Sequence, residues 1–156
     1  MKDESESESE SESERGTPMA ALSVDDYPIV TVDKIRYSDT DKQGHVNNAV
    51  FSMFLETGRV ELFYRPDEPL TSANAEFVVA SIKLELKGEI HWPGEVKTGL
   101  GVKRIGNSSI HLGQALFYKG KCVAQAETVI VQIDQETRKS MPLSSKTRKR
   151  LQELSL

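Results

Sequence analysis

Residues 48–64 form the one long segment of this chain without the alternation of apolar and polar side chains typical of strands. Asn47 or Asn48 can cap the start of a helix here, and Pro66 ends it. The apolar side chains cover most of a helical circumference: Ala49, Val50, Phe51, Met53, Phe54, Leu55, Val60, Leu62 and Phe63. One polar stripe interrupts them with helical spacing: Asn48, Ser52, Glu56 and Arg59. The pattern predicts a helix that is buried on nearly every side.

Strand-like segments flank this helix along the sequence. Residues 27–37 precede it as a β-branched run. Four segments with strand character follow it: 81–87, 96–105, 110–118 and 122–133. A short helix is expected from Ser145. This order predicts an α+β domain in which a curved antiparallel sheet of about five strands wraps around one long central helix. Because one sheet covers only one side of the helix, we expect a second copy of the chain to cover the other.

The composition excludes several classes of protein. The chain has 156 residues, enough for one domain, and a formal charge of −4. The first 15 residues carry seven acidic and two basic side chains, so the remaining 141 carry 17 acidic and 18 basic ones and a charge of +1. This near balance of charge argues against nucleic-acid binding. No apolar run approaches the ~18 residues of a membrane span, and the acidic N-terminus is unlike a targeting signal, so we expect a cytoplasmic protein.

The N-terminal segment differs in composition from the rest of the chain. From Glu4 to Glu14, Glu and Ser alternate strictly, and such a stretch has nothing to bury. We predict that residues 1–23 are a disordered acidic tail and that residues 24–156 form a single domain. The lone cysteine, Cys122, excludes an intramolecular disulfide and is expected to be a small core residue.

The polar loop of residues 38–48 holds the side chains best suited to chemistry. Two carboxylates, an imidazole and two carboxamides come directly before the predicted helix start: Asp39, Asp41, His45, Asn47 and Asn48. Free N–H groups at a helix start can hold a carbonyl oxygen as negative charge builds on it. A carboxylate beside them can attack the carbonyl carbon or activate water. The same residues also fit a structural role, in which both carboxylates cap turns and the imidazole is only hydrogen-bonded.

The sequence contains no competing catalytic motif. It has no Gly-rich phosphate loop and no Ser nucleophile elbow. The three histidines, His45, His91 and His111, lack the spacing of metal ligands, so we expect no metal. A carboxylate at Glu56, on so apolar a helix, is costly to bury unless it pairs with Arg59 or takes part in a reaction.

The run from Arg36 to Ala49 resembles the hot-dog-fold acyl-CoA thioesterases of the 4-hydroxybenzoyl-CoA thioesterase type. Its core, Asp-x-Asp-x-x-Gly-His-Val-Asn-Asn, is fairly specific for this branch. The likeness continues in the family's order through Glu56, Arg59, Pro93 and residues 105–109 and 134–142. It covers most of the chain, from about Val30 to Leu143.

The resemblance implies a hot-dog fold that assembles into a homodimer or homotetramer, with the active sites at subunit interfaces. It implies that Asp41 is the catalytic carboxylate, acting as nucleophile or as base for water. The backbone N–H of Asn48 would polarise the thioester carbonyl. Glu56, at the position of a catalytic Glu in another branch, would be a supporting residue or the alternative base. The residues that shape the site would be Gly44, His45 and Asn47.

Coenzyme A is expected as part of the substrate, with no separate cofactor. Some relatives carry basic residues on the turn that is occupied here by residues 106–108, and this chain does not. The remaining candidates for substrate contacts are Arg104, Ser108, Ser109, Arg138 and Lys139.

The sequence therefore predicts an enzyme that hydrolyses an acyl thioester to a free acid and coenzyme A. Three other activities stay open: hydrolysis of acyl carrier protein thioesters, hydration or dehydration of an acyl chain, and acyl-CoA binding without catalysis. Hot-dog dehydratases and hydratases pair a His with an acid across the interface, whereas this chain has the thioesterase-type loop at Asp41.

Overall fold

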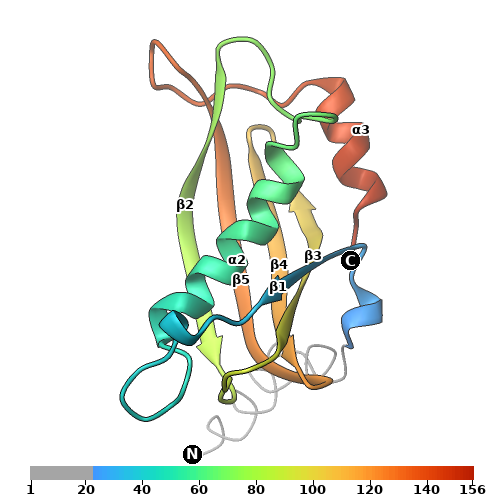
Figure 1. The fold of residues 1–156 in the computed structure, drawn as a ribbon. Coiled ribbons are helices and arrows are strands. Elements are labelled where there is room, and N and C mark those ends of the chain that lie inside the picture. The colour runs from blue at the N-terminus through green and yellow to red at the C-terminus, as the bar shows by residue number, and fades with distance from the viewer. Residues whose placement is uncertain (1–22) are drawn as a thin grey trace, which may run out of the picture.

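The computed structural model describes residues 23–156, and the predicted acidic tail lies outside this range except for Ser23. A five-stranded antiparallel sheet, in the order β1-β3-β4-β5-β2, forms the body of the structure (Figure 1). The strands are β1 (Ile29–Lys34), β2 (Ala75–Leu86), β3 (Glu95–Ile105), β4 (Ser109–Tyr118) and β5 (Lys121–Asp134). The sheet thus has β1 and β2 as its two edges.

One long helix, α2 (Asn48–Phe63), lies across one face of this sheet and packs against β1, β3 and β4 (Figure 1). Its start is fixed by Asn47, whose side-chain oxygen accepts a hydrogen bond from the Ala49 N–H at 2.9 Å. The side chains that face the sheet are buried: Phe51, Phe54, Leu55, Arg59, Leu62 and Phe63. The predicted α+β architecture, one sheet around one long helix, is confirmed.

The outer side of α2 is open in a single chain, and this is the side that the sequence-based prediction leaves for a second copy to cover. Met53 is 53% exposed, and Val60 and Tyr64 are also exposed. Because α2 covers β1, β3 and β4, it leaves much of the neighbouring face of β2 uncovered, where Ile82 and Leu86 are exposed. These two share a face of β2 with Leu84, which packs against the core.

The shorter elements differ in part from the prediction. β1 ends at Lys34, and a 3₁₀ turn, η3 (Tyr37–Asp39), replaces the end of the predicted strand. β2 begins six residues before residue 81. The C-terminal helix is present as α3 (Ser145–Glu153), with Ser144 as its N-cap, and a further 3₁₀ turn, η2 (Val24–Asp26), precedes β1. No helix within residues 23–156 is long and apolar enough to cross a membrane.

The two ends of the sheet carry different parts of the chain. We call one the N-cap end: there Lys34 of β1 pairs with Glu95 of β3, and the chain continues from β1 toward the start of α2 (Figure 1). We call the other the C-cap end: there Ala75 pairs with Asp134, and residues 106–108 connect β3 to β4. α2 finishes at this second end, where the Phe63 ring lies 4.6 Å from that of Phe77.

Candidate functional site

A tight turn at the N-cap end presents Asp41. The Asp41 N–H donates to the His45 carbonyl at 2.8 Å, and the Gly44 N–H donates to the Asp41 carbonyl at 3.0 Å. The Gln43 N–H donates to Asp41 Oδ1 at 2.9 Å. Gly44 has φ of +79°, a conformation that L side chains rarely adopt. The turn therefore fixes the Asp41 carboxylate while leaving it exposed to solvent.

The start of α2 lies directly after this turn. The Asn47 N–H donates to the Asp39 carbonyl at 2.9 Å, and the Asn47 carbonyl accepts from the Val50 N–H at 2.8 Å. The N–H of Asn48 belongs to the first residue of α2, so it has no intrahelical acceptor and lies at the positive end of the helix. Such a group is suited to hold an oxygen that gains negative charge.

A hollow of about 250 Å³ joins these two features. The residues that line it are Asp41, Gln43, His45, Val46, Asn47, Asn48, Phe51, Gly88 and Glu89. Four of the predicted site residues, Asp41, His45, Asn47 and Asn48, thus surround one space, and Gly44 shapes the turn beside it. A carboxylate and a helix start on one hollow can act together on a carbonyl group.

The two acidic residues of the loop have different surroundings. Asp39 is only 4% exposed and accepts hydrogen bonds from the Arg36 N–H at 2.8 Å and from Arg36 Nη2 at 3.2 Å. These bonds explain the η3 turn and match the structural role considered for Asp39. Asp41, by contrast, accepts one local bond and borders the hollow, so it is the carboxylate available to a substrate.

Glu56 does not border this hollow. Its neighbour Arg59 is buried and donates through Nη1 to Gln114 Oε1 at 3.3 Å, while Gln114 Nε2 donates to the Leu55 carbonyl at 2.9 Å. Burial lowers the pKa of the Arg59 guanidinium, and the negative charge of Glu56 opposes that shift. Glu56 is therefore placed to balance the buried charge of Arg59. This matches the structural pairing with Arg59 that the sequence left open, beside the expected role as supporting residue or alternative base.

The other predicted substrate contacts lie at or toward the C-cap end, away from Asp41 within one chain (Figure 1). Arg104 lies near the end of β3 opposite His111, and Ser108 and Ser109 belong to the adjoining turn and the start of β4. Arg138 donates to Glu76 Oε2 at 2.8 Å, and the Lys139 carbonyl accepts from the Asp134 N–H at 2.9 Å. A single chain thus separates the predicted site into two groups.

Two residues beside the hollow, Glu89 and His91, were not predicted as site residues from the sequence. The carboxylate of Glu89 lies 3.4 Å from His45 Nε2 and 3.3 Å from His91 Nε2. The two imidazole rings are perpendicular, with centroids 4.7 Å apart. The only signal in the sequence is the Glu-Ile-His spacing of residues 89–91, which places Glu89 and His91 on one side of an extended segment.

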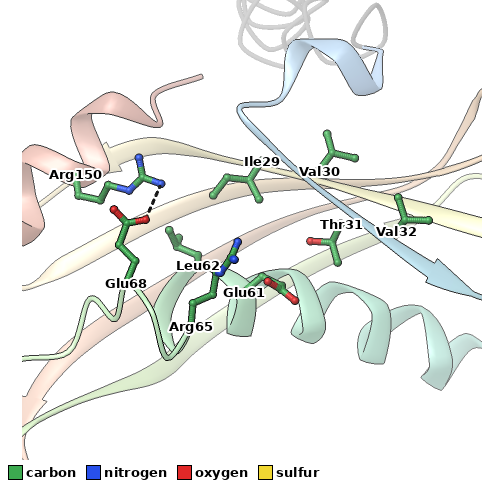
Figure 2. A pocket seen from close by; sticks show the side chains of 9 residues that line it. All are labelled: Ile29, Val30, Thr31, Val32, Glu61, Leu62, Arg65, Glu68 and Arg150. Atoms are coloured by element: carbon green, nitrogen blue, oxygen red, sulfur yellow. Dashed lines mark ion pairs between the residues drawn. The ribbon is translucent and has the colours of Figure 1, made fainter.

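A larger hollow of about 350 Å³ lies between β1, the end of α2 and α3 (Figure 2). Its charged side chains are acidic and basic in equal number: Glu61, Glu68, Arg65 and Arg150. Figure 2 shows Arg150 directed at Glu68, and their charged atoms are 4.0 Å apart. Arg65 is also paired, with Asp67 at 3.2 Å. The hollow contains no helix start and none of the predicted site residues, so the smaller hollow at Asp41 is the better candidate.

Comparison with known protein families matches residues 35–151 to the thioesterase-like superfamily. No match is found among the curated proteins. Among solved structures, the chain is similar to a predicted thioesterase from Bacillus stearothermophilus, with 27% identity and a TM-score of 0.75 over 82% of this chain and 96% of that one. It is also similar to a thioesterase from Thermus thermophilus complexed with coenzyme A and Zn, with 28% identity and a TM-score of 0.70 over 82% and 94% of the two chains.

A third similar structure is the probable thioesterase YbaW from Escherichia coli, with 26% identity and a TM-score of 0.71 over 82% of this chain and 99% of that one. The family match spans the Asp41 loop, α2 and the four strands β2 to β5. The predicted resemblance is therefore confirmed: the chain belongs to the thioesterase-like superfamily and is a thioester hydrolase of the hot-dog fold.

Proposed function

We propose that this thioester hydrolase cleaves acyl-CoA to a free acid and coenzyme A, with Asp41 as its catalytic carboxylate. The observation that carries the proposal is that the exposed Asp41 carboxylate and the start of α2 at Asn48 line the same hollow. Asp41 is the exposed carboxylate of the loop, whereas Asp39 is engaged with Arg36.

In the proposed reaction the thioester carbonyl oxygen faces the Asn48 N–H, which stabilises negative charge as the tetrahedral intermediate forms. As a nucleophile, Asp41 would bond to the carbonyl carbon, the C–S bond would break to release the coenzyme A thiolate, and water would then hydrolyse the mixed anhydride. As a base, Asp41 would take a proton from a water molecule that attacks the same carbon, and the thiolate would leave with a proton. Both routes need an ionised carboxylate at Asp41.

Coenzyme A is the proposed carrier because a thioesterase with 28% identity to this chain was solved with coenzyme A. Phe51 lines the hollow beside Asn48 and offers an apolar surface to an acyl group. An acyl carrier protein would present the same thioester, so both carriers belong in the test.

We also propose that the active unit is a homodimer or a homotetramer. Exposed apolar side chains lie on α2, on the residue that follows it and on β2: Met53, Val60, Tyr64, Val79, Ile82 and Leu86. Covering them with a second copy would remove apolar surface from water. A second copy would also supply a C-cap end, with its candidate substrate contacts, to the Asp41 hollow of the first.

Thiol release from a panel of acyl-CoA substrates tests the proposal when Asp41→Asn is measured beside the unsubstituted chain. The amide keeps an oxygen that can accept from the Gln43 N–H, so the turn is retained while the charge is removed. We expect the rate to fall by about 10²–10⁴-fold, the usual contribution of a positioned acid or base. Turnover close to that of the unsubstituted chain would overturn the role of Asp41.

Asp67→Asn is the matched control, because it makes the same chemical change at an exposed carboxylate paired with Arg65. Its rate is expected to equal that of the unsubstituted chain. Burial raises the pKa of the Cys122 thiol, so the protein itself adds little to a thiol signal near neutral pH. Turnover of acyl carrier protein thioesters alone would replace the proposed substrate, and binding without turnover on either carrier would indicate an acyl-CoA-binding protein.

A further inference from the structure

His45, Glu89 and His91 bring three potential metal ligands together at the edge of the Asp41 hollow. Their ligand atoms all lie within 4.8 Å of one another. The backbone sets this arrangement: His45 and His91 face each other across an antiparallel bridge, and the Val46 N–H donates to the Ile90 carbonyl at 2.8 Å. Residues opposite each other in such a bridge project to the same side, and Glu89 joins them because it lies two residues before His91.

The two distances to Glu89 fit ligands of a tetrahedral ion better than hydrogen-bonded partners. One oxygen of Glu89 is 3.4 Å from His45 Nε2 and 3.3 Å from His91 Nε2. Charge-assisted N–H···O bonds are shorter, about 2.7–2.9 Å. Ligands that lie ~2.0–2.1 Å from a tetrahedral zinc ion are separated from each other by about 3.3–3.4 Å. The third pair, between the two imidazole nitrogens, lies within 4.8 Å.

We propose that His45 Nε2, His91 Nε2 and the Glu89 carboxylate form a binding site for Zn²⁺ or a similar first-row transition-metal ion. Two imidazoles and one carboxylate are the ligand set such ions prefer, whereas Mg²⁺ and Ca²⁺ prefer oxygen ligands alone. All three side chains are reachable from solvent, with exposed fractions of 30%, 62% and 47% for His45, Glu89 and His91. Three protein ligands leave one tetrahedral position for a water molecule.

The site would act on the loop that carries Asp41. The His45 carbonyl accepts the Asp41 N–H, so an ion bound to the His45 side chain holds this turn to residues 88–91. Binding itself does not depend on the proposed reaction, because none of the three ligands is the proposed catalytic carboxylate.

Calorimetric titration of Zn²⁺ into the full chain, without an affinity tag and after removal of metal with a chelator, tests the site. We expect one ion per chain, a rise in the midpoint of thermal unfolding, and an affinity at least about tenfold lower in His91→Ala. Glu89→Gln is expected to weaken binding in the same direction. Co²⁺ provides an independent signal, because tetrahedral Co²⁺ absorbs visible light far more strongly than octahedral Co²⁺.

His111→Ala is the matched control, since it removes the third histidine of the chain, which lies on β4 and outside the cluster. It should leave Zn²⁺ affinity unchanged. Absence of stoichiometric binding, equal affinity in His91→Ala and the unsubstituted chain, or an equal loss in His111→Ala would each overturn the site. Thiol release by the metal-free protein is measured in parallel, so that a failed metal site and a failed hydrolase are told apart.

Discussion

Asp33 lies on β1 with its side chain directed toward the inside of the molecule, and its Oδ2 atom is buried without a hydrogen-bond partner. Burial raises the pKa of this carboxyl, the charges of Glu61 and Asp39 raise it further, and Arg36 opposes them. A raised pKa means that the folded chain holds the proton more tightly than the unfolded chain does. Ionised Asp33 therefore lowers the stability of the fold as the pH rises through that pKa.

Asp33→Asn removes this unfavourable charge. We expect the substituted chain to be more stable at pH 7, with a higher midpoint of thermal unfolding. The difference should shrink as the pH falls and disappear below about pH 3, where the carboxyl is protonated in the unfolded chain as well. Thermal unfolding followed by circular dichroism at several pH values measures it. Asp25→Asn, at an exposed carboxylate, should show no such gain, and a loss of stability in Asp33→Asn at pH 7 would contradict the argument.

At the scale of single residues, the sequence identifies groups that are neighbours along the chain. Asp41 and Asn48 were predicted together because a short loop and a helix start bring them to one place, and the hollow contains both. Glu89 and His91 were missed because their link to His45 depends on a backbone bridge between segments more than forty residues apart. The separate role of Asp39 was left open for a similar reason, since its burial and its bond to Arg36 appear only in the folded chain.

Among the elements, α2 lies close against the sheet at Gly58. A Cβ added at Gly58 would lie 3.0 Å from Thr98 Cγ2 and 3.1 Å from Gln114 Nε2. The second contact matters because Gln114 links β4 to α2 through the Leu55 carbonyl and Arg59. Glycine here permits close packing, although it is a poor helix former.

Gly58→Ala is expected to destabilise the fold by about 1–2 kcal/mol. Crowding in a packed core costs ~1–3 kcal/mol, and the better helix propensity of alanine recovers less than about 1 kcal/mol. Urea unfolding measures the change in the free energy of unfolding. Thr57→Ala, at the exposed adjacent position, should change it by no more than about 0.5 kcal/mol. A chain made more stable by Gly58→Ala would show that the helix can move away from the sheet at little cost.

Helices and strands could be predicted from the sequence where one pattern of apolar and polar residues continues along the whole element. α2 was predicted within one residue of its end because its apolar residues, its cap and Pro66 agree. The first half of β2 was missed, since residues 75–80 lack the regular alternation that marks residues 81–87 and a register shift follows Val79. The end of β1 was predicted too late in the sequence. The hydrogen bond from the Arg36 N–H to the Asp39 side chain stabilises the η3 turn, and the β propensity of single residues gives no information on such a bond.

For the whole molecule, the uncovered faces of α2 and β2 are the surfaces on which the proposed assembly of several copies rests. Ile82 is 48% exposed on β2, which is an edge strand, and Met53 and Val60 are exposed on the outer side of α2. Long exposed edges with apolar side chains invite pairing with another chain. The expectation of a second copy came from the helix pattern in the sequence, and which strand it would cover became visible only with the packing of α2.

Ile82→Lys is expected to shift the proposed dimer or tetramer toward a single chain, because a buried, unpaired ammonium group disfavours an apolar interface. Light scattering coupled to size-exclusion chromatography measures the mass, and thiol release should fall with it. Val32→Lys is the matched control at the opposite edge of the sheet, where Val32 is 53% exposed on β1. If Val32→Lys breaks the assembly and Ile82→Lys does not, the interface lies at β1, and the proposed interface at β2 is wrong.

The two groups of predicted site residues at opposite ends of the sheet have a consequence for mixed populations of the protein. A reaction that uses the Asp41 loop of one copy and the C-cap end of another belongs to the pair and to neither chain alone. A chain damaged only at its loop and a chain damaged only at its other end can then complement each other, with about one intact site in each mixed dimer. Two chains that are each inactive alone, one through its loop and the other through its C-cap end, would thus regain activity when they are mixed.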